Sequence, residues 1–285
     1  MISVSVSVSD HRLASETSML QKRILTAVIT LPLIIAGIIY LKPLYFSFIL
    51  AALLLVGAWE WSALISLTHP LLRALYVIAV LGGIVIGAFL PVFYVLLVSS
   101  VMWVCAAIAV IYYQRCGAST LFQYAIVRAL MGFIALVSAW IAMMMVRTQL
   151  NLGAHWLIVL LLFIFAADVG GYFSGRFLGK HALCSRVSPK KTWEGLWGGL
   201  LFSMIVAAIG GLFLSLSHHQ YVYFILLAWI TSLFSVAGDL TVSVLKRMSG
   251  VKDSGTFFPG HGGVLDRIDS VAAATVIFAL GVLVL

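Results

Sequence analysis

Long apolar segments alternate with short polar ones along almost the whole chain. A helix of about 20 apolar residues crosses the roughly 30 Å hydrocarbon core of a bilayer. The uncharged stretch from residue 74 to residue 113 would extend about 60 Å as one helix, so we divide it at Pro91. The pattern then predicts nine spans, at residues 24–41, 44–65, 74–90, 92–113, 129–146, 155–175, 195–216, 221–245 and 270–285. We therefore expect an all-α, polytopic integral membrane protein of about nine transmembrane helices.

The composition excludes a water-soluble domain. Only 9% of the 285 residues are charged and 63% are apolar, which leaves too few charges to cover a soluble surface. The opening segment, MISVSVSVSD, is of low complexity. It lacks a basic stretch followed directly by an apolar core, so we expect a disordered tail over residues 1–22 rather than a cleaved signal.

The basic residues collect on one side of these spans. With the N-terminus in the cytoplasm, Lys42 and Arg147 fall on the opposite side, and nearly all other lysines and arginines fall in cytoplasmic segments. This asymmetry follows the positive-inside rule. The net charge of +8 is thus a property of the cytoplasmic face, where it also attracts anionic membrane lipids. No compact basic domain lies outside the membrane, so we exclude nucleic acid as a partner.

The first half of the chain offers little chemistry. Glu60 is the only acid between Glu16 and Asp168, and it stands between Trp59 and Trp61 near the cytoplasmic end of its span. Interfacial aromatic residues with a carboxylate at the membrane edge account for this stretch. A role for Glu60 in helix pairing or at the mouth of a site is the alternative.

Polar residues become frequent from Asp168 onward. Asp168 lies about 13 residues, or roughly 20 Å, from the outer end of its helix. That depth is in the cytoplasmic half of the bilayer, where a carboxylate faces a partner or a wet cavity. Gly171, Gly175 and Gly179 follow at intervals of four residues and predict the close approach of another helix.

The segment SPKKTWEG, from Ser188 to Gly195, has the pattern of a helix start with Ser188 or Thr192 as the N-cap. Lys190 and Lys191 would then lie at a helix N-terminus, where free backbone N–H groups favour anions. We interpret the segment as a candidate binding site for phosphate groups. A plain cytoplasmic anchor is the alternative for the two lysines.

A second polar group lies on the eighth predicted span. Asp239, Ser243, Lys246 and Arg247 fall at i, i+4, i+7 and i+8, and helical geometry puts the first three on one face. Asp239 lies near the cytoplasmic boundary, where its charge requires a cation from a metal or a neighbouring side chain. An ion pair with Lys246 or with another helix is the alternative to a metal site.

The last loop, KDSGTFFPGHGGVLDRID, concentrates six ionisable residues: Lys252, Asp253, His261, Asp266, Arg267 and Asp269. Asp266 and Asp269 are three positions apart, so they share a face of a helix. Carboxylate oxygens at that spacing suit Mg²⁺ rather than zinc. Lys252 and Arg267 provide cations for phosphate oxygens, and the glycines around His261 allow the backbone to approach a ligand closely.

Together these segments predict a wet pocket at the cytoplasmic lipid surface. It would contain carboxylates, cations and flexible glycine backbone. Metal-assisted phosphoryl chemistry requires this combination, because it depends on charge neutralisation and in-line positioning of the reacting groups. The constellation therefore favours an enzyme that acts on an anionic substrate.

The C-terminal half also resembles a known enzyme family. From Ser243 to Asp269 the chain reads Ser-x-x-Lys-Arg, four residues, Lys-Asp-x-Gly, and then His-Gly-Gly-x-x-Asp-Arg-x-Asp. This pattern resembles that of the phosphatidate cytidylyltransferase family, also called CDP-diacylglycerol synthase, and the SPKKTWEG block and the Gly-Asp-Leu at 238–240 fit as well. The resemblance implies that CTP and phosphatidate react to give CDP-diacylglycerol and pyrophosphate for phospholipid synthesis.

The resemblance also implies a divalent-dependent homodimer in the bacterial inner membrane, with its site facing the cytoplasm. It implies Mg²⁺ as cofactor, bound by Asp239, Asp266 and Asp269, and K⁺ as a second ion. We expect Lys246, Arg247 and His261 to act with those three acids in catalysis. The expected substrate-binding residues are Ser188, Lys190, Lys191, Thr192, Ser243, Lys252, Asp253 and Arg267. On this interpretation residues 23–154 form N-terminal transmembrane helices and residues 155–285 a C-terminal transmembrane catalytic region.

Two other functions remain as alternatives. A CTP-dependent lipid kinase of the polyprenol type would transfer the γ-phosphoryl group to an alcohol, and His261 could then serve as its base. An ion-coupled transporter would use its intramembrane acids. The acids of this chain, however, gather at one face instead of the midplane, and no inverted repeat is visible.

Overall fold

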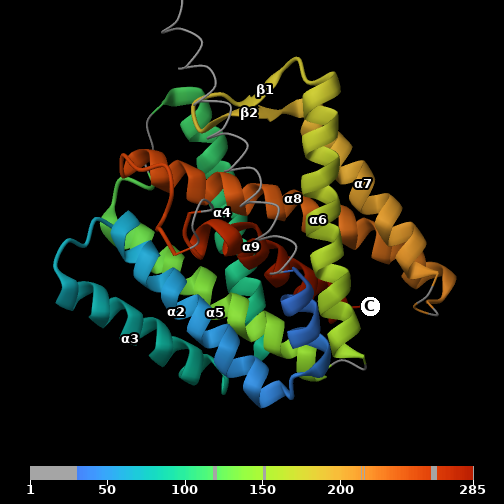
Figure 1. The fold of residues 1–285 in the computed structure, drawn as a ribbon, viewed down its shortest axis with the longest axis horizontal. Helices are drawn as coiled ribbons and strands as arrows, with labels where there is room; N and C mark the ends of the chain where they lie inside the picture. The colour runs from blue at the N-terminus through green and yellow to red at the C-terminus, as the bar shows by residue number, and fades with distance from the viewer. Residues whose placement is uncertain are drawn as a thin grey trace, which may run out of the picture.

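Figure 1 shows the computed structural model, which describes residues 31–117, 121–149, 152–212, 214, 216–257 and 262–284. A helix at Leu31–Tyr40 is followed by α2 (Pro43–Leu64), α3 (Pro70–Gly87), α4 (Val92–Cys116), α5 (Ala125–Gln149), α6 (Gly153–Leu178), β1 (Ala182–Cys184), β2 (Ser188–Thr192), α7 (Trp193–Gly211), α8 (His218–Met248) and α9 (Leu265–Val282). The expected tail at residues 1–22, the start of the first span at residues 24–30, and His261 lie outside the described residues.

Seven of the described helices, α2 to α8, are long and apolar enough to cross a membrane. The helix Leu31–Tyr40 is shorter, and α9 carries Asp266, Arg267 and Asp269 near its start. The predicted break at Pro91 is correct, because α3 ends at Gly87 and α4 begins at Val92. The prediction of an all-α, polytopic membrane protein is confirmed.

Helix α9 lies in the middle of the bundle (Figure 1). It packs against α2, α4, α5, α6 and α8, and its side chains are buried continuously from Ala272 to Ala279. A helix that is apolar on every face is stable when other helices cover it on every side. Its first turn is held close to α8, since a Cβ atom at Gly238 would lie 2.5 Å from the Asp269 carbonyl oxygen.

Helices α6 and α7 form the tightest pair through small residues. A Cβ atom at Gly195 of α7 would lie 2.8 Å from the Gly171 carbonyl oxygen and 3.3 Å from the Gly175 Cα atom. One at Gly199 would lie 2.5 Å from the Ala167 carbonyl oxygen. Close approach along the predicted glycine stripe is therefore confirmed, and it fixes the segment that connects the two helices.

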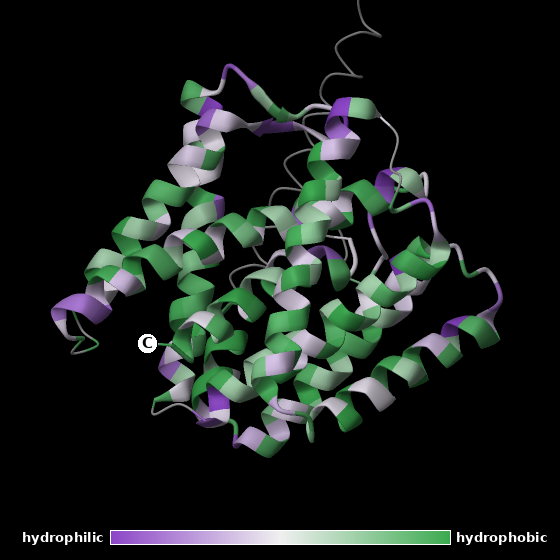
Figure 2. Ribbon diagram, turned by 180° about the vertical axis from the view of Figure 1, so that it is seen from behind, coloured by the Kyte–Doolittle hydropathy of each residue, from purple (hydrophilic) through white to green (hydrophobic). Residues whose placement is uncertain are grey.

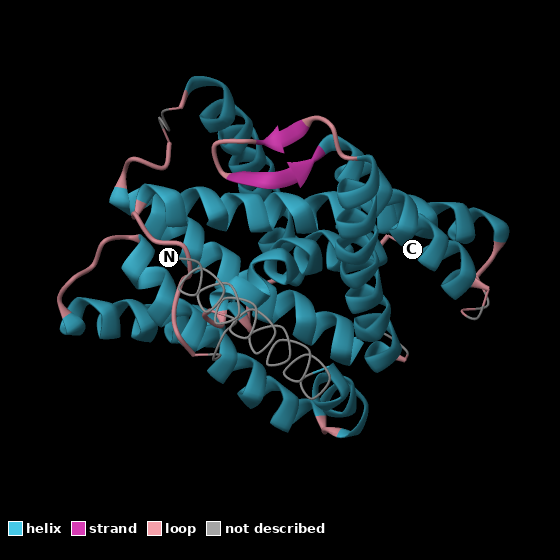
Figure 3. Ribbon diagram, turned by 45° about the horizontal axis from the view of Figure 1, so that its top comes forward, coloured by secondary structure: helices cyan, strands magenta, loops and turns pink. Residues whose placement is uncertain are grey.

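That connection contains an antiparallel two-stranded sheet, which we call the ribbon (residues 182–192). Ala182 pairs with Thr192 and Cys184 pairs with Ser188. The strands are distinct from the helices in Figure 3. The ribbon is the main departure from the sequence prediction, which had no strand and placed a helix start within residues 188–195 with Ser188 or Thr192 as its cap.

Side chains from two helices hold the turn of the ribbon. Gln114 of α4 donates to Ser185 Oγ at 3.0 Å and accepts from the backbone N–H of Arg186 at 3.1 Å. Arg247 of α8 donates from Nε to the Val187 carbonyl oxygen at 3.2 Å. The Val187 side chain is buried between these contacts, so the ribbon is anchored to the helical bundle.

The ribbon lies on the side of the bundle where α4 and α6 end and α7 begins (Figure 1). Figure 2 shows hydrophilic residues on the ribbon and at helix ends, while the bodies of the helices are mainly hydrophobic. The polar segments singled out in the sequence thus lie at helix ends.

Candidate active site

Asp239 binds the ribbon to α8. Lys191 of β2 donates from Nζ to Asp239 Oδ2, and Ser243, one turn further along α8, donates to Asp239 Oδ1 at 3.2 Å. The ion pair expected with Lys246 or another helix is therefore made by a strand residue 48 positions earlier in the chain. This contact joins the SPKKTWEG block to the α8 polar face.

Asp266 forms the second ion pair of the site. Lys246 of α8 donates from Nζ to Asp266 Oδ1 at 2.6 Å. The backbone N–H groups of Ser254 and Gly263 both donate to Asp266 Oδ2, each at 2.9 Å. The Lys246 and Asp266 side chains are only 12% and 9% exposed, so this pair is well shielded from water.

Asp269 is the most enclosed of the predicted acids. It is 5% exposed, and its Oδ1 accepts from the backbone N–H of Ser270 at 2.7 Å and from Ser270 Oγ at 3.2 Å. The charges of Asp239, Lys246 and Lys191 all act on its carboxyl group. An ionised Asp269 would thus be repelled by the Asp239 carboxylate across the α8–α9 contact and attracted by the two lysines.

Asp168 of α6 belongs to the same electrostatic cluster. Its carboxyl group interacts with the charges of Lys191, Asp239 and Arg267. Its side chain is exposed on α6, and its predicted partner or wet cavity stays a prediction. The site thus collects acids from α6, α8 and α9 and a lysine from β2.

The other predicted residues divide into two groups. Thr192 caps α7, accepting from the Gly195 N–H at 3.1 Å, as expected of one of the two candidate caps. Ser188, the other candidate, is instead paired with Cys184 in the ribbon, and Lys190 and Lys191 lie in strand β2 rather than at a helix N-terminus. The predicted helix start with Thr192 as its cap is thus confirmed, whereas Ser188 as the cap is wrong because the chain remains extended until Thr192.

Several predicted residues are more exposed. Lys190, Lys252, Asp253 and Arg267 are exposed at the surface, and Arg247 supports the ribbon turn through Val187. Their roles in substrate binding stay predictions. His261 lies outside the described residues.

Cys184 of β1 pairs with β2, the strand that contains Lys191, but it is not poised as a nucleophile. Burial raises the pKa of the Cys184 thiol, and the charge of Lys191 only partly opposes this rise. A protonated, buried thiol is unreactive. The carboxylates and cations are therefore the candidate reactive groups of the site.

Glu60 is the acid whose place the sequence did not establish. It is 5% exposed on α2 and accepts hydrogen bonds from Ser254 Oγ at 3.0 Å and from the backbone N–H groups of Val264 and Leu265 at 3.0 and 2.7 Å. Glu60 is therefore buried against the last loop rather than placed at the membrane interface, and a role at the mouth of the site stays a prediction. A lone acid in the apolar first half of the chain was the available signal.

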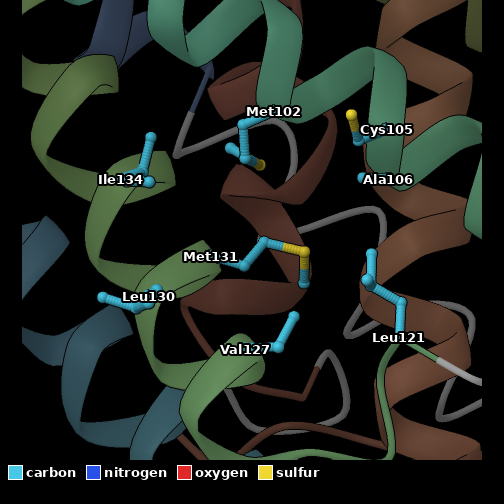
Figure 4. Close-up of a pocket in the computed structure, with 8 residues that line it drawn as sticks. All are labelled: Met102, Cys105, Ala106, Leu121, Val127, Leu130, Met131 and Ile134. Atoms are coloured by element: carbon cyan, nitrogen blue, oxygen red, sulfur yellow. The ribbon is translucent and has the colours of Figure 1, made fainter.

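An apolar pocket lies elsewhere in the bundle, between α4 and α5 (Figure 4). Its lining residues are Met102, Cys105, Ala106, Leu121, Val127, Leu130, Met131 and Ile134. None of these carries a charge, so the pocket cannot neutralise an anionic substrate. The acid and lysine cluster remains the candidate active site.

Fold and site together define a polytopic membrane protein that concentrates carboxylates, lysines and glycine backbone at the ends of its helices. Among the described residues, no three His, Cys, Asp or Glu side chains are grouped closely enough to hold a metal ion. The carboxylates of Asp239 and Asp266 are engaged by lysines instead. Metal binding by the three predicted aspartates therefore stays a prediction.

Comparison with known proteins agrees with this class. The family model described as the cytidylyltransferase family matches residues 21–285, and the chain belongs to this family. A phosphatidate cytidylyltransferase of Pseudomonas aeruginosa is 38% identical over 263 residues, covering 92% of this chain and 96% of that protein. One from Haemophilus influenzae is 34% identical over 285 residues, covering 92% and 98%. One from Bacillus subtilis is 40% identical over 144 residues, covering 49% and 53%.

Proposed function

We propose that this protein transfers the cytidylyl group of CTP to phosphatidate, giving CDP-diacylglycerol and pyrophosphate. The observation that carries the proposal is the pairing of Asp239 with Lys191 and of Asp266 with Lys246 around the enclosed Asp269. The names of the relatives from Pseudomonas and Haemophilus support the same substrates.

The chemistry requires little covalent work from the protein. A phosphate oxygen of phosphatidate attacks the α-phosphorus of CTP and forms a new P–O bond. The bond from the α-phosphorus to the oxygen that bridges the α- and β-phosphorus atoms breaks. The bonding electrons leave with pyrophosphate. Because the phosphatidate oxygen is already anionic, no serine, cysteine or general base has to be activated.

The main obstacle is repulsion between two anionic substrates. Lys191 and Lys246 lie in the cluster. Each ammonium group can exchange its carboxylate partner for a phosphate oxygen of a substrate. Positioned cations of this kind stabilise the charge that develops on the leaving pyrophosphate. Phosphatidate reaches such a site sideways from the lipid leaflet, while CTP arrives from water.

We propose Mg²⁺ as the cofactor, held by Asp239, Asp266 and Asp269, with K⁺ as a second ion. The residue types suit the ion, because hard carboxylate oxygens are its preferred protein ligands, but the three side chains are not grouped around one point, and Asp239 and Asp266 would have to exchange their lysine partners for the ion. An ionised Asp269 would be repelled by the Asp239 carboxylate, and a divalent cation bound by both groups would remove that repulsion. When bound, Mg²⁺ supplies charge neutralisation at the phosphate oxygens.

We further propose a homodimer in the bacterial inner membrane, with the site open to the cytoplasm and surrounded by membrane lipids. Bacterial relatives support the choice of membrane. The excess of lysine and arginine in the segments assigned to the cytoplasm supports the orientation.

The fate of the CTP phosphates separates the proposal from a CTP-dependent lipid kinase. Purified protein in lipid nanodiscs is incubated with phosphatidate and Mg²⁺, using CTP labelled at either the α- or the γ-phosphate. The proposal predicts that α-label appears in lipid and γ-label in pyrophosphate. Transfer of γ-label to lipid, or α-label that stays in water-soluble nucleotide, would contradict it.

A further inference from the structure

Glu60 connects the N-terminal half of the chain to the candidate active site. It lies on α2, about 200 positions from the residues it contacts, and its side chain is almost completely buried. Its Oε1 accepts from the Val264 N–H, and its Oε2 accepts from the Leu265 N–H and from Ser254 Oγ. Both carboxylate oxygens are therefore used, and three donors from the last loop converge on one side chain.

The backbone near Glu60 is shaped to receive this carboxylate. A Cβ atom at Gly255 would lie 2.3 Å from Glu60 Oε1, and its three nearest atoms would all belong to Glu60. A Cβ atom at Gly263 would lie 2.3 Å from Glu60 Oε2 and 2.4 Å from Ser254 Oγ. Two glycines thus leave the space that the carboxylate occupies, one on each side of the loop.

The same loop residues hold Asp266. Ser254 donates its N–H to Asp266 Oδ2 and its hydroxyl to Glu60, while the Gly263 N–H donates to Asp266 Oδ2. Glu60 also binds the two N–H groups at the start of α9, immediately before Asp266. The carboxylates of Glu60 and Asp266 therefore both bind residue 254 on one side of the loop and residues 263–265 on the other. Asp266 also forms an ion pair with Lys246.

A purely structural role does not require a charge at this position. An apolar side chain would fill the space against α9 without the cost of burying a carboxylate, which is several kcal/mol for an uncompensated ion. The carboxylate is tolerated because three hydrogen bonds satisfy it, and those bonds order the backbone that carries Asp266.

We propose that Glu60 is a positioning residue of the transfer reaction. It sets the conformation of residues 254–255 and 263–265, and through them the placement of Asp266 and Lys246 against the substrate phosphates. The proposal rests on the proposed function for its kinetic consequence, but its structural claim can be measured without any turnover.

Glu60→Gln is the sharpest variant because it keeps the shape of the side chain. Whichever way the amide is placed, its NH₂ group faces a backbone N–H, of Val264 or of Leu265. We expect kcat to fall about 100-fold, as for a small misplacement of a catalytic group, with the KM for CTP changed by less than about threefold. Ser62→Ala is the matched control, since it removes a buried hydroxyl on α2 that bonds to Trp59 and Arg73 rather than to the loop.

Gly255→Ala provides an independent variant at the other side of the same contact. Alone, the added methyl group collides with Glu60 and should lower kcat at least about tenfold. In a Glu60→Ala background the collision is removed, so Glu60→Ala/Gly255→Ala should match Glu60→Ala within about twofold. Such non-additivity is the mark of two residues in direct contact.

Amide hydrogen exchange gives the readout that does not depend on activity. In Glu60→Gln, exchange at Ser254, Gly263, Val264 and Leu265 should accelerate at least about tenfold, while exchange in α5 and α6 stays as in the wild type. Unchanged exchange at these four amides would overturn the proposal, as would wild-type kcat in Glu60→Gln or additive effects of Glu60→Ala and Gly255→Ala. A wild-type protein that forms no CDP-diacylglycerol would refute the proposed function and leave the exchange result to decide the role of Glu60.

Discussion

The Lys246–Asp266 pair gives a prediction whose size can be worked out from its surroundings. Both side chains are nearly buried, at 12% and 9% exposure, and their charged atoms are 2.6 Å apart. Removing one partner of a buried pair leaves an unpaired charge and costs about 3–5 kcal/mol. Asp266 would retain the hydrogen bonds from Ser254 and Gly263, so we expect Lys246→Met to lower the free energy of unfolding by about 3 kcal/mol, the lower end of that range.

Lys191 and Asp239 provide a matched comparison within the same site. Each of these side chains is 31% exposed, so water screens the pair and Lys191→Met should cost about 1 kcal/mol or less. Both substitutions should reduce turnover severely, because both lysines are proposed to contact phosphate. Lys191→Met should therefore lose activity while keeping most of its stability, whereas Lys246→Met should lose both.

The assay is equilibrium unfolding by titration of SDS into mild-detergent micelles, followed by tryptophan fluorescence, since the chain contains 8 tryptophans. Asp266→Asn in the Lys246→Met background removes the stranded charge and should restore most of the lost stability. Equal losses for Lys246→Met and Lys191→Met would refute the reasoning. So would a double variant that is less stable than Lys246→Met alone.

Three further predictions concern orientation, substrate handling and packing. In a cysteine-free background, Lys252→Cys should react with an impermeant thiol reagent from the cytoplasmic face and Ser217→Cys from the opposite face, since both positions are exposed; labelling of both from one side would contradict the proposed orientation. Gln at both Lys190 and Lys191 should raise the KM for CTP more than that for phosphatidate, and Gln at both Lys246 and Arg247 should show the reverse bias, with equal effects on both substrates contradicting the assignment. Gly195→Ala should destabilise the protein by about 1–3 kcal/mol, because the new Cβ would lie 2.8 Å from the Gly171 carbonyl oxygen, whereas Gly210→Ala, with open space around it, should be neutral; a neutral Gly195→Ala would argue against the close α6–α7 contact.

Hydropathy predicts the helices well because each span must satisfy its own backbone hydrogen bonds within lipid. The division at Pro91 follows from length alone, and the structure separates α3 from α4 at that point. The close approach of α6 and α7 could also be predicted, because glycines four residues apart, such as Gly171 and Gly175, leave a flat helix face.

The ribbon could not be predicted in this way. Ser188 to Thr192 has the composition of a helix cap, but it pairs with Ala182–Cys184 because Gln114 and Arg247 hold the turn from two separate helices. Local sequence carries no information about those partners. The tertiary contacts keep residues 188–191 extended, and the helix begins only after the Thr192 cap.

Within the site, the sequence predicted which residue types gather but not which of them pair. The i, i+4 relation of Asp239 and Ser243 was sufficient to predict their contact. Lys191 and Asp239 are 48 positions apart, and Glu60 and Leu265 are 205 apart, so these contacts depend on the packing of the bundle. The same packing brings Glu60 against the loop that contacts Asp266, although the first half of the chain has few polar residues.

Product formation by matched wild-type and Asp269→Asn proteins tests the central claim most directly. Asp269 is buried beside Asp239, and its substitution by Asn conserves shape while removing the charge that the proposed cofactor requires. In nanodiscs containing phosphatidate, with CTP and Mg²⁺ supplied, the wild type should form CDP-diacylglycerol and pyrophosphate in equal amounts. Asp269→Asn should remain folded, with an unchanged unfolding midpoint or a higher one, and should form neither product. Wild-type protein that forms neither product, or an Asp269→Asn variant that turns over at the wild-type rate, would contradict the account.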